Sequence, residues 1–155
     1  MGKLYTSRYS NKDLQHTDAL KVGISAGLPR FPLKYELTAN LTQLAPGRAI
    51  FRMTDKAAFR RKYFEQLDRL GIAMVEQLIK SVWRGNGEKD LILLCYEDVT
   101  CDDNSKNWCH RTYLAEWLRE RLGYEVEEYP DSGCYAAKHK EEPKEDDGFE
   151  QMLLF

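Results

Sequence analysis

LILLCY, residues 91–96, is the stretch of sequence that decides the fold. It is a continuous apolar run that follows the turn-forming sequence RGNGEKD at residues 84–90. Short apolar runs bounded by such turns are typical of strands that are covered on both faces, as the inner strands of parallel sheets are. Residues 91–96 are therefore predicted to form the central strand of a mainly parallel sheet.

Three further strands are predicted around this one. Residues 3–9 and 21–25 form short strands before it, and YEVEEY at residues 124–129 forms a final edge strand. Between residues 25 and 32, the sequence SAGLPRFP contains Gly27, Pro29 and Pro32, which disfavour regular structure and predict a rigid loop directly after a strand.

Helical patterns separate these strands. Thr54 or Asp55 is suited to cap a first helix, Gly71 is placed to end it, and Gly123 is placed to end the last one. The apolar positions recur at helical spacing. They are Phe59, Tyr63, Leu67 and Leu70 in the first helix, Ile72, Val75, Ile79 and Val82 in the second, and Leu114, Trp117, Leu118 and Leu122 in the last. Alternating helices and strands predict a small, three-layer, Rossmann-like α/β domain over residues 1–137.

The chain of 155 residues has the usual size of one domain. Its first residues show no signal-peptide pattern, and it contains no apolar run long enough to cross a membrane, so a cytoplasmic protein without a membrane partner is expected. In that compartment the four cysteines, at positions 95, 101, 109 and 134, are expected to be reduced thiols or ligands rather than disulfides.

Candidate catalytic residues gather where the central strand ends and the last helix begins. In open α/β sheets, ligands bind beyond the carboxyl ends of the strands. Cys95 and Glu97 lie at the end of the strand, and Cys109, His110 and Arg111 lie at the start of the helix. The positive end of a helix acidifies a thiol such as that of Cys109, and Arg111 is suited to hold an anion.

The alternative is a purely structural role for the same residues. Cys95 is then a small buried apolar residue, His110 a satisfied polar group, and Arg111 an ion-pair partner of Glu97.

A metal site is the other alternative, because three cysteines and one histidine lie within residues 95–110. Structural zinc sites favour ligand pairs separated by two to four residues, which this stretch lacks. The adjacent Cys109 and His110 are also expected to point in different directions at a helix start. The sequence therefore predicts no metal and no cofactor. A separate ligand-binding loop is predicted at Ser25, Gly27 and Arg30.

Six motifs, in this order, resemble the domain of unknown function 488 family over residues 3–128. They are YTSRYSN (5–11), VGISAGLPRF (22–31), LAPGRAIF (44–51), YFEQLDRL (63–70), LLCYE (93–97) and CHRTYLAEWL (109–118). The resemblance implies a Rossmann-like domain without an established activity, in which Cys95, Glu97, Cys109, His110 and Arg111 occupy motif positions. The loop of residues 99–108, which contains Cys101, is longer than the family pattern.

The end of the chain has a different composition. Residues 138–150 contain three lysines and six acidic residues, whereas residues 1–137 contain 20 basic and 19 acidic residues. So polar a segment cannot bury enough apolar surface to fold, which predicts a disordered acidic linker. The nearly neutral body lacks the positive charge that gives many proteins a sequence-independent affinity for DNA.

The last five residues, QMLLF (151–155), form an apolar end after this linker. They resemble the pentapeptide with which bacterial replication and repair proteins bind the DNA sliding clamp. In that resemblance Gln151 hydrogen-bonds at the rim of the clamp pocket, Met152 fills a secondary site, and Leu154 and Phe155 fill the main pocket. A linker of this length reaches roughly 20 Å, which suits a tether that holds the body near DNA.

Three functions remain open at this point. The first is a nucleoid-associated accessory protein of DNA replication or repair, bound to DNA indirectly through the clamp, with a nucleic-acid-processing or nucleotide site at the CHR motif. The second is a non-enzymatic module, viral in origin, such as a phage protein, that occupies or inhibits the clamp. The third is a nucleotide-binding or small-molecule-binding α/β domain whose tail packs on its own body.

Overall fold

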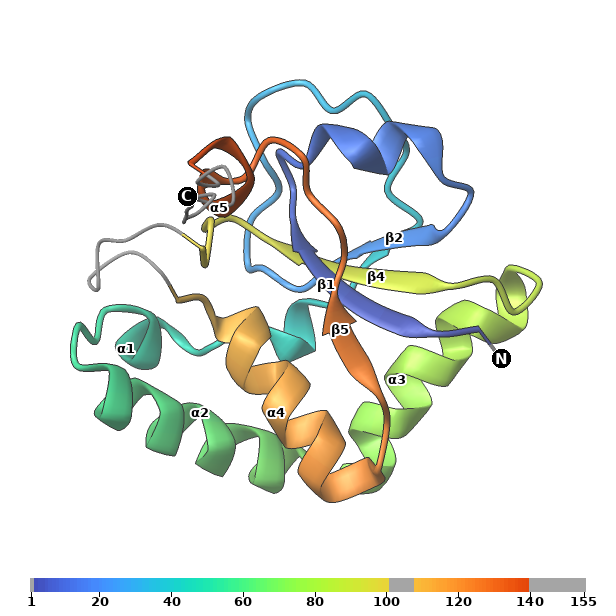
Figure 1. The fold of residues 1–155 in the computed structure, drawn as a ribbon. Coiled ribbons are helices and arrows are strands. Elements are labelled where there is room, and N and C mark those ends of the chain that lie inside the picture. Colours follow the sequence, from blue (N-terminus) through green and yellow to red (C-terminus); the bar gives the residue numbers. More distant parts are fainter. Residues whose placement is uncertain (1, 101–107, 140–155) are drawn as a thin grey trace, which may run out of the picture.

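The computed structural model describes residues 2–100 and 108–139. The predicted linker from residue 140 onward and the predicted clamp-binding residues 151–155 lie outside this range, as does Cys101. Figure 1 shows one sheet with helices on either side of it.

The sheet has five strands in the order β3-β2-β4-β1-β5, and every pair of neighbours is parallel. Their bounds are Leu4–Arg8 (β1), Leu20–Gly23 (β2), Ala39–Asn40 (β3), Leu91–Cys95 (β4) and Val126–Glu128 (β5). All five residues of β4 are buried. The predicted central strand is confirmed, and so is the predicted edge strand, which is β5.

Three helices, α2 (Lys56–Leu70), α3 (Ile72–Gly85) and α4 (His110–Leu122), cover one face of the sheet (Figure 1). Asp55 caps α2 by accepting a hydrogen bond from the backbone N–H of Ala57, so Asp55 rather than Thr54 is the cap. Gly71 ends α2, as predicted. Gly123 ends α4 in the left-handed conformation, at φ 68°, which residues with a side chain rarely adopt.

The other face carries a thinner layer. The 3₁₀ helix η1 (Lys12–His16) buries Leu14 against Ile92 and Leu94 of β4. Leu33, Tyr35 and Leu37, from the loop that follows β2, complete this second apolar cluster. Because both faces of β4 are covered, the predicted Rossmann-like α/β class is confirmed.

Five short elements were not predicted. They are η1, β3, the 3₁₀ helix η2 (Thr42–Leu44), α1 (Arg48–Phe51) and α5 (Tyr135–Lys138). Each has five residues or fewer, which is too short to show a helical or strand period. The last of them includes Lys138, the first residue of the predicted linker. Within the described residues, no helix has the length and apolar character needed to span a membrane.

Candidate functional site

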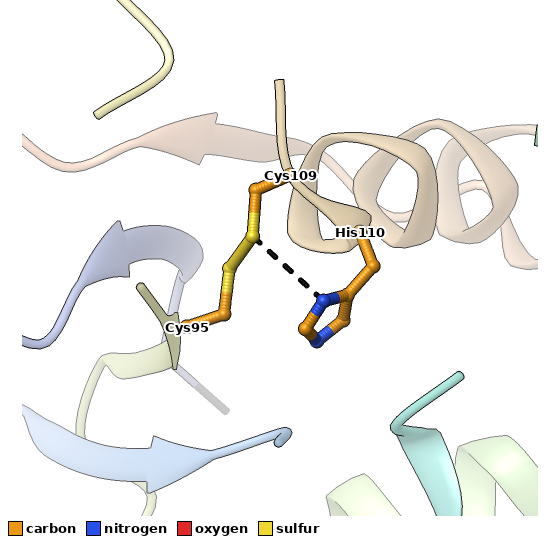
Figure 2. Close-up of side chains that lie close together, drawn as sticks. All are labelled: Cys95, Cys109 and His110. Atoms are coloured by element: carbon orange, nitrogen blue, oxygen red, sulfur yellow. Dashed lines mark hydrogen bonds between the residues drawn. A yellow bond between two sulfur atoms is a disulfide. The ribbon is translucent and has the colours of Figure 1, made fainter. Parts of the chain in front are cut away.

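The end of β4 and the start of α4 lie next to each other, as the sequence predicted. Cys95 is the last residue of β4, Cys109 is the N-cap of α4, and His110 is the first residue of that helix. All three side chains are buried, and Figure 2 shows the imidazole of His110 turned toward the two cysteines.

Cys95 and Cys109 form a disulfide, with their Cα atoms 7.3 Å apart. The expectation of reduced thiols is therefore wrong for this pair in the state that the structure describes. Cys134 is a free thiol at the N-cap of α5. With its sulfur bonded to Cys95, Cys109 is not available here as the acidified thiol that the sequence predicted.

His110 has one defined proton position. Its Nε2 lies 2.7 Å from the carbonyl oxygen of Ile24, and because a carbonyl only accepts, Nε2 carries the proton and donates it. Nδ1 therefore has a free lone pair, which lies 3.7 Å from Sγ of Cys109. Burial lowers the pKa of His110 to about 4, so the imidazole is neutral at physiological pH.

Arg111 is buried, and all its nitrogens have partners. Nε and Nη2 donate to the carboxylate of Glu128, with Nη2 to Oε2 at 2.7 Å. Nη1 donates to the backbone carbonyl of Glu97 at 2.7 Å and approaches Sγ of Cys95 at 3.3 Å. Arg111 thus offers no free guanidinium to an anion, and its carboxylate partner is Glu128 rather than Glu97. Arg111 is a positioning residue, because its hydrogen bonds connect the backbone just after β4 to Glu128 of β5.

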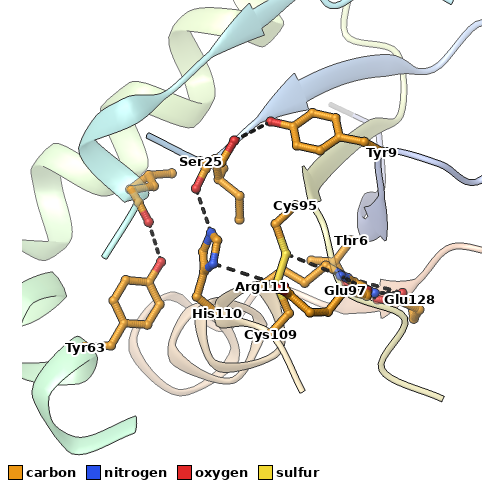
Figure 3. The surroundings of a disulfide bond; sticks show 12 residues. Thr6, Tyr9, Ser25, Tyr63, Cys95, Glu97, Cys109, His110, Arg111 and Glu128 are labelled. Carbon is orange, nitrogen blue, oxygen red and sulfur yellow. Dashed lines mark hydrogen bonds and ion pairs between the residues drawn. A yellow bond between two sulfur atoms is a disulfide. The ribbon is translucent and has the colours of Figure 1, made fainter. Parts of the chain in front are cut away.

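Glu128 is a site residue that sequence reasoning missed. It lies at the end of β5, where Thr6 of β1 donates a hydrogen bond to it at 2.8 Å (Figure 3). Nothing in the local sequence distinguishes it from Glu125 or Glu127. Only the pairing of β5 with β1 brings it to Arg111.

A pocket of about 570 Å³ opens beside this cluster, beyond the carboxyl ends of β2 and β4. The predicted loop residues Ser25, Gly27 and Arg30 line it, together with Glu97 and His110. The predicted residues therefore divide into two groups. Glu97, His110 and the loop face the pocket, whereas Cys95, Cys109 and Arg111 are not among its lining residues.

Hydrogen bonds fix the loop at the pocket. Ser25 Oγ lies 2.7 Å from the hydroxyl of Tyr9 (Figure 3). It donates to the carbonyl of Gly27, which also accepts a hydrogen bond from the hydroxyl of Tyr96. Burial raises the pKa of Tyr9, so its hydroxyl stays protonated. Gly23 permits this arrangement, because a Cβ there would lie 2.4 Å from the Tyr9 hydroxyl.

Large apolar side chains form much of the pocket wall. Leu28, Phe31, Phe51 and Tyr96 are all exposed, with Phe51 the most exposed at 66%. The sequence signal that was overlooked is the pair Leu28 and Phe31, which stand in a polar-looking Gly/Pro loop where neither can join a strand or helix face.

Two arginines supply the positive charge of the pocket. Arg30 comes from the loop after β2, and Arg48 is the first residue of α1. Within residues 2–100 and 108–139, the side chain of neither arginine makes a hydrogen bond or an ion pair. Against one exposed carboxylate, that of Glu97, they leave the pocket with a positive balance.

Comparison of the chain with protein-family models, with curated proteins and with solved structures found no match. The resemblance to the domain of unknown function 488 family therefore stays a prediction that rests on the six motifs.

Proposed function

We propose that the domain binds a small organic anion with a flat or apolar body, of about the size of a nucleotide, in the pocket beside His110. The observation that carries this proposal is the pocket itself. Its volume falls within the range of small-molecule sites, and it lies beyond the carboxyl ends of parallel strands.

The wall and the charge of the pocket select the chemistry of the ligand. Phe31, Phe51 and Tyr96 offer aromatic surface to a planar group. Arg30 and Arg48 have no partner within the described part of the chain, and a guanidinium binds phosphate or carboxylate through two parallel hydrogen bonds. A nucleoside monophosphate combines both features, and it matches the nucleotide-binding alternative left open by the sequence.

The two arginines provide the test. We expect the double change Arg30→Ala and Arg48→Ala to weaken binding of a nucleoside monophosphate by about 100-fold or more, because each of the two arginines loses at least one hydrogen bond worth about 1.5–3 kcal/mol. Binding of the uncharged nucleoside should change little. Isothermal titration calorimetry measures both affinities.

Arg61→Ala is the matched control, since Arg61 is an exposed arginine of α2 that does not line the pocket. Both variants alter exposed side chains and should fold normally. Failure of the wild-type chain to bind any of the nucleoside monophosphates, or equal binding by the double variant, would contradict the proposal.

A second function is favoured by the sequence of the chain end. The peptide 151–155 follows a charged segment, and it ends in two large apolar residues. In this proposal the peptide recruits the domain of residues 1–137 to the bacterial sliding clamp, and through the clamp to DNA and the nucleoid. Recruitment compensates for the small net charge of that domain. The same peptide suits a non-enzymatic clamp inhibitor, which differs from an accessory protein in blocking clamp-dependent synthesis.

Deleting residues 151–155 should abolish measurable binding to a purified bacterial sliding clamp in surface plasmon resonance. Removal of the apolar side chains takes away the groups that fill the clamp pocket, whereas Glu150→Ala, just before the peptide, should leave the affinity nearly unchanged. Undiminished binding after the deletion would exclude the docking role. Absence of clamp binding in the full chain, combined with a lower melting temperature after the deletion, would favour a tail packed on its own body.

A further inference from the structure

Cys95, Cys109 and His110 form a compact set of metal ligands. Their two sulfurs and one imidazole nitrogen all lie within 4.8 Å of one another, and all three residues are buried. The expectation that adjacent Cys109 and His110 point in different directions is wrong, because the extended N-cap residue and the first helical residue turn their side chains to the same side (Figure 2). We propose that the chain binds one Zn²⁺ through Cys95, Cys109 and His110 when the disulfide is reduced.

The spacing of these atoms suits a tetrahedral zinc ion. With zinc–sulfur bonds of about 2.3 Å and zinc–nitrogen bonds of about 2.0 Å, a cysteine sulfur and an imidazole nitrogen on one ion lie roughly 3.5 Å apart. Sγ of Cys109 and Nδ1 of His110 are 3.7 Å apart. The Cα atoms of the two cysteines, 7.3 Å apart, are more widely spaced than the 4.4–6.8 Å of most disulfides, which leaves room for two sulfurs that are not bonded to each other.

The surroundings already orient the imidazole as a ligand. Histidine ligands commonly donate their second N–H to a carbonyl or carboxylate, which fixes the tautomer and aims the other nitrogen at the metal. In this protein the carbonyl of Ile24 accepts a hydrogen bond from Nε2–H of His110 at 2.7 Å, and Nδ1 faces the sulfurs.

Positive charge lies beside both sulfurs. Nη1 of Arg111 lies 3.3 Å from Sγ of Cys95, and Cys109 stands at the N-terminus of α4, a helix of 13 residues whose backbone dipole is positive at that end. Two thiolates and one Zn²⁺ sum to zero charge, so the buried site needs no further counter-ion.

Three protein ligands leave the fourth position of zinc for water or another small ligand. Two cysteines and one histidine with an open position form one of the ligand sets of catalytic zinc sites. His110 also lines the pocket, so the ion would lie next to the proposed anion site while depending on none of its arginines.

The disulfide and the metal exclude each other. Reduction by a dithiol reductant breaks the Cys95–Cys109 bond with two electrons and two protons, and the reductant itself becomes a disulfide. Binding of Zn²⁺ then releases the two thiol protons. A small disulfide oxidant reverses the sequence by thiol–disulfide exchange: the two thiolates form the Cys95–Cys109 bond again, the oxidant takes up two electrons and two protons to become two thiols, and the ion leaves. The redox state of one pair of residues therefore sets metal occupancy.

Cobalt(II), which takes the same tetrahedral ligands and absorbs light when bound to thiolates, is the probe. The full chain is reduced with a phosphine, and the phosphine is then removed under anaerobic conditions. The reduced chain is titrated with Co²⁺ and then with Zn²⁺. We expect a thiolate-to-metal band that saturates at about one ion per chain and disappears as Zn²⁺ displaces Co²⁺. The chain with its disulfide intact should show no band, and equal signals from the two forms would overturn the proposal.

Single substitutions assign the ligands. Cys95→Ala and Cys109→Ala should each weaken Zn²⁺ binding by about 100-fold or more, measured against a chromogenic chelator, and His110→Gln should remove the nitrogen ligand with a similar loss. Cys134→Ala and Cys101→Ala are the matched controls and should bind as the wild type does. Circular dichroism identifies any variant that fails to fold. For such a variant, the Co²⁺ titration of reduced and oxidised wild type still tests whether the two cysteines bind the metal. Metal binding that needs Cys101 or Cys134, or that survives loss of both Cys95 and Cys109, would refute the assignment.

Discussion

Replacing Arg111 by alanine is expected to destabilise the folded domain by about 2–3 kcal/mol, because the change removes a buried guanidinium together with its charged hydrogen bonds to Glu128 and Glu97. The side chain of Arg111 is 1% exposed, whereas that of Glu128 is 37% exposed. The change leaves the carboxylate of Glu128 without its cation and the carbonyl of Glu97 without a donor. Urea denaturation followed by circular dichroism measures the loss.

Arg60→Ala is the matched control for this prediction. Arg60 also faces a carboxylate with two nitrogens, that of Glu116 on α4, but its side chain is 40% exposed. Water screens such a pair, so its loss should cost no more than about 1 kcal/mol. Equal costs for the two changes would mean that burial of Arg111 adds nothing to its interaction with Glu128.

Replacing Trp117 by alanine should cost about 3–5 kcal/mol, the usual range for removing a large aromatic side chain from a core. Trp117 is fully buried, and its indole N–H donates to Asp68 of α2 at 2.9 Å. It anchors α4 two turns after Cys109 and His110, so its loss should also loosen the helix start that carries both residues. The melting temperature and hydrogen exchange of the α4 amides measure the two effects.

Trp117→Phe separates packing from hydrogen bonding. It keeps an aromatic ring in the core but removes the donor to Asp68, which retains Arg121 as a partner. The expected cost is therefore well below that of the alanine change. A loss as large as that of Trp117→Ala would show that the hydrogen bond, and not the packing of the ring, holds α4 in place.

The longer elements were predictable because each carries its own signal. Strand β4 is a buried apolar run. Helix α2 has an apolar pattern between its cap, Asp55, and its end at Gly71, and α4 has one that ends at Gly123. These signals act within a few residues of one another. Strand β3 has two residues and forms only because it pairs with the edge of β2, so no local sequence pattern predicts it.

The candidate site was predictable only in part. The rule that chemistry gathers at the carboxyl ends of parallel strands correctly placed Cys95 close to His110. The rule does not say in which direction a side chain points. Side-chain direction decides three features of the site: the bond between Cys95 and Cys109, the proton position of His110 and the pairing of Arg111 with Glu128.

The sequence by itself determined the α/β class, the central place of β4 and the strand-to-helix junction, since apolar periodicity and helix caps act over neighbouring residues. Only the tertiary structure decided that Ile24, Cys95, Cys109 and His110 meet at one point and that a pocket opens beside them. Ile24 follows β2, Cys95 ends β4, and Cys109 and His110 begin α4. The distances between these three groups are therefore set by the packing of β2, β4 and α4 rather than by spacing along the chain.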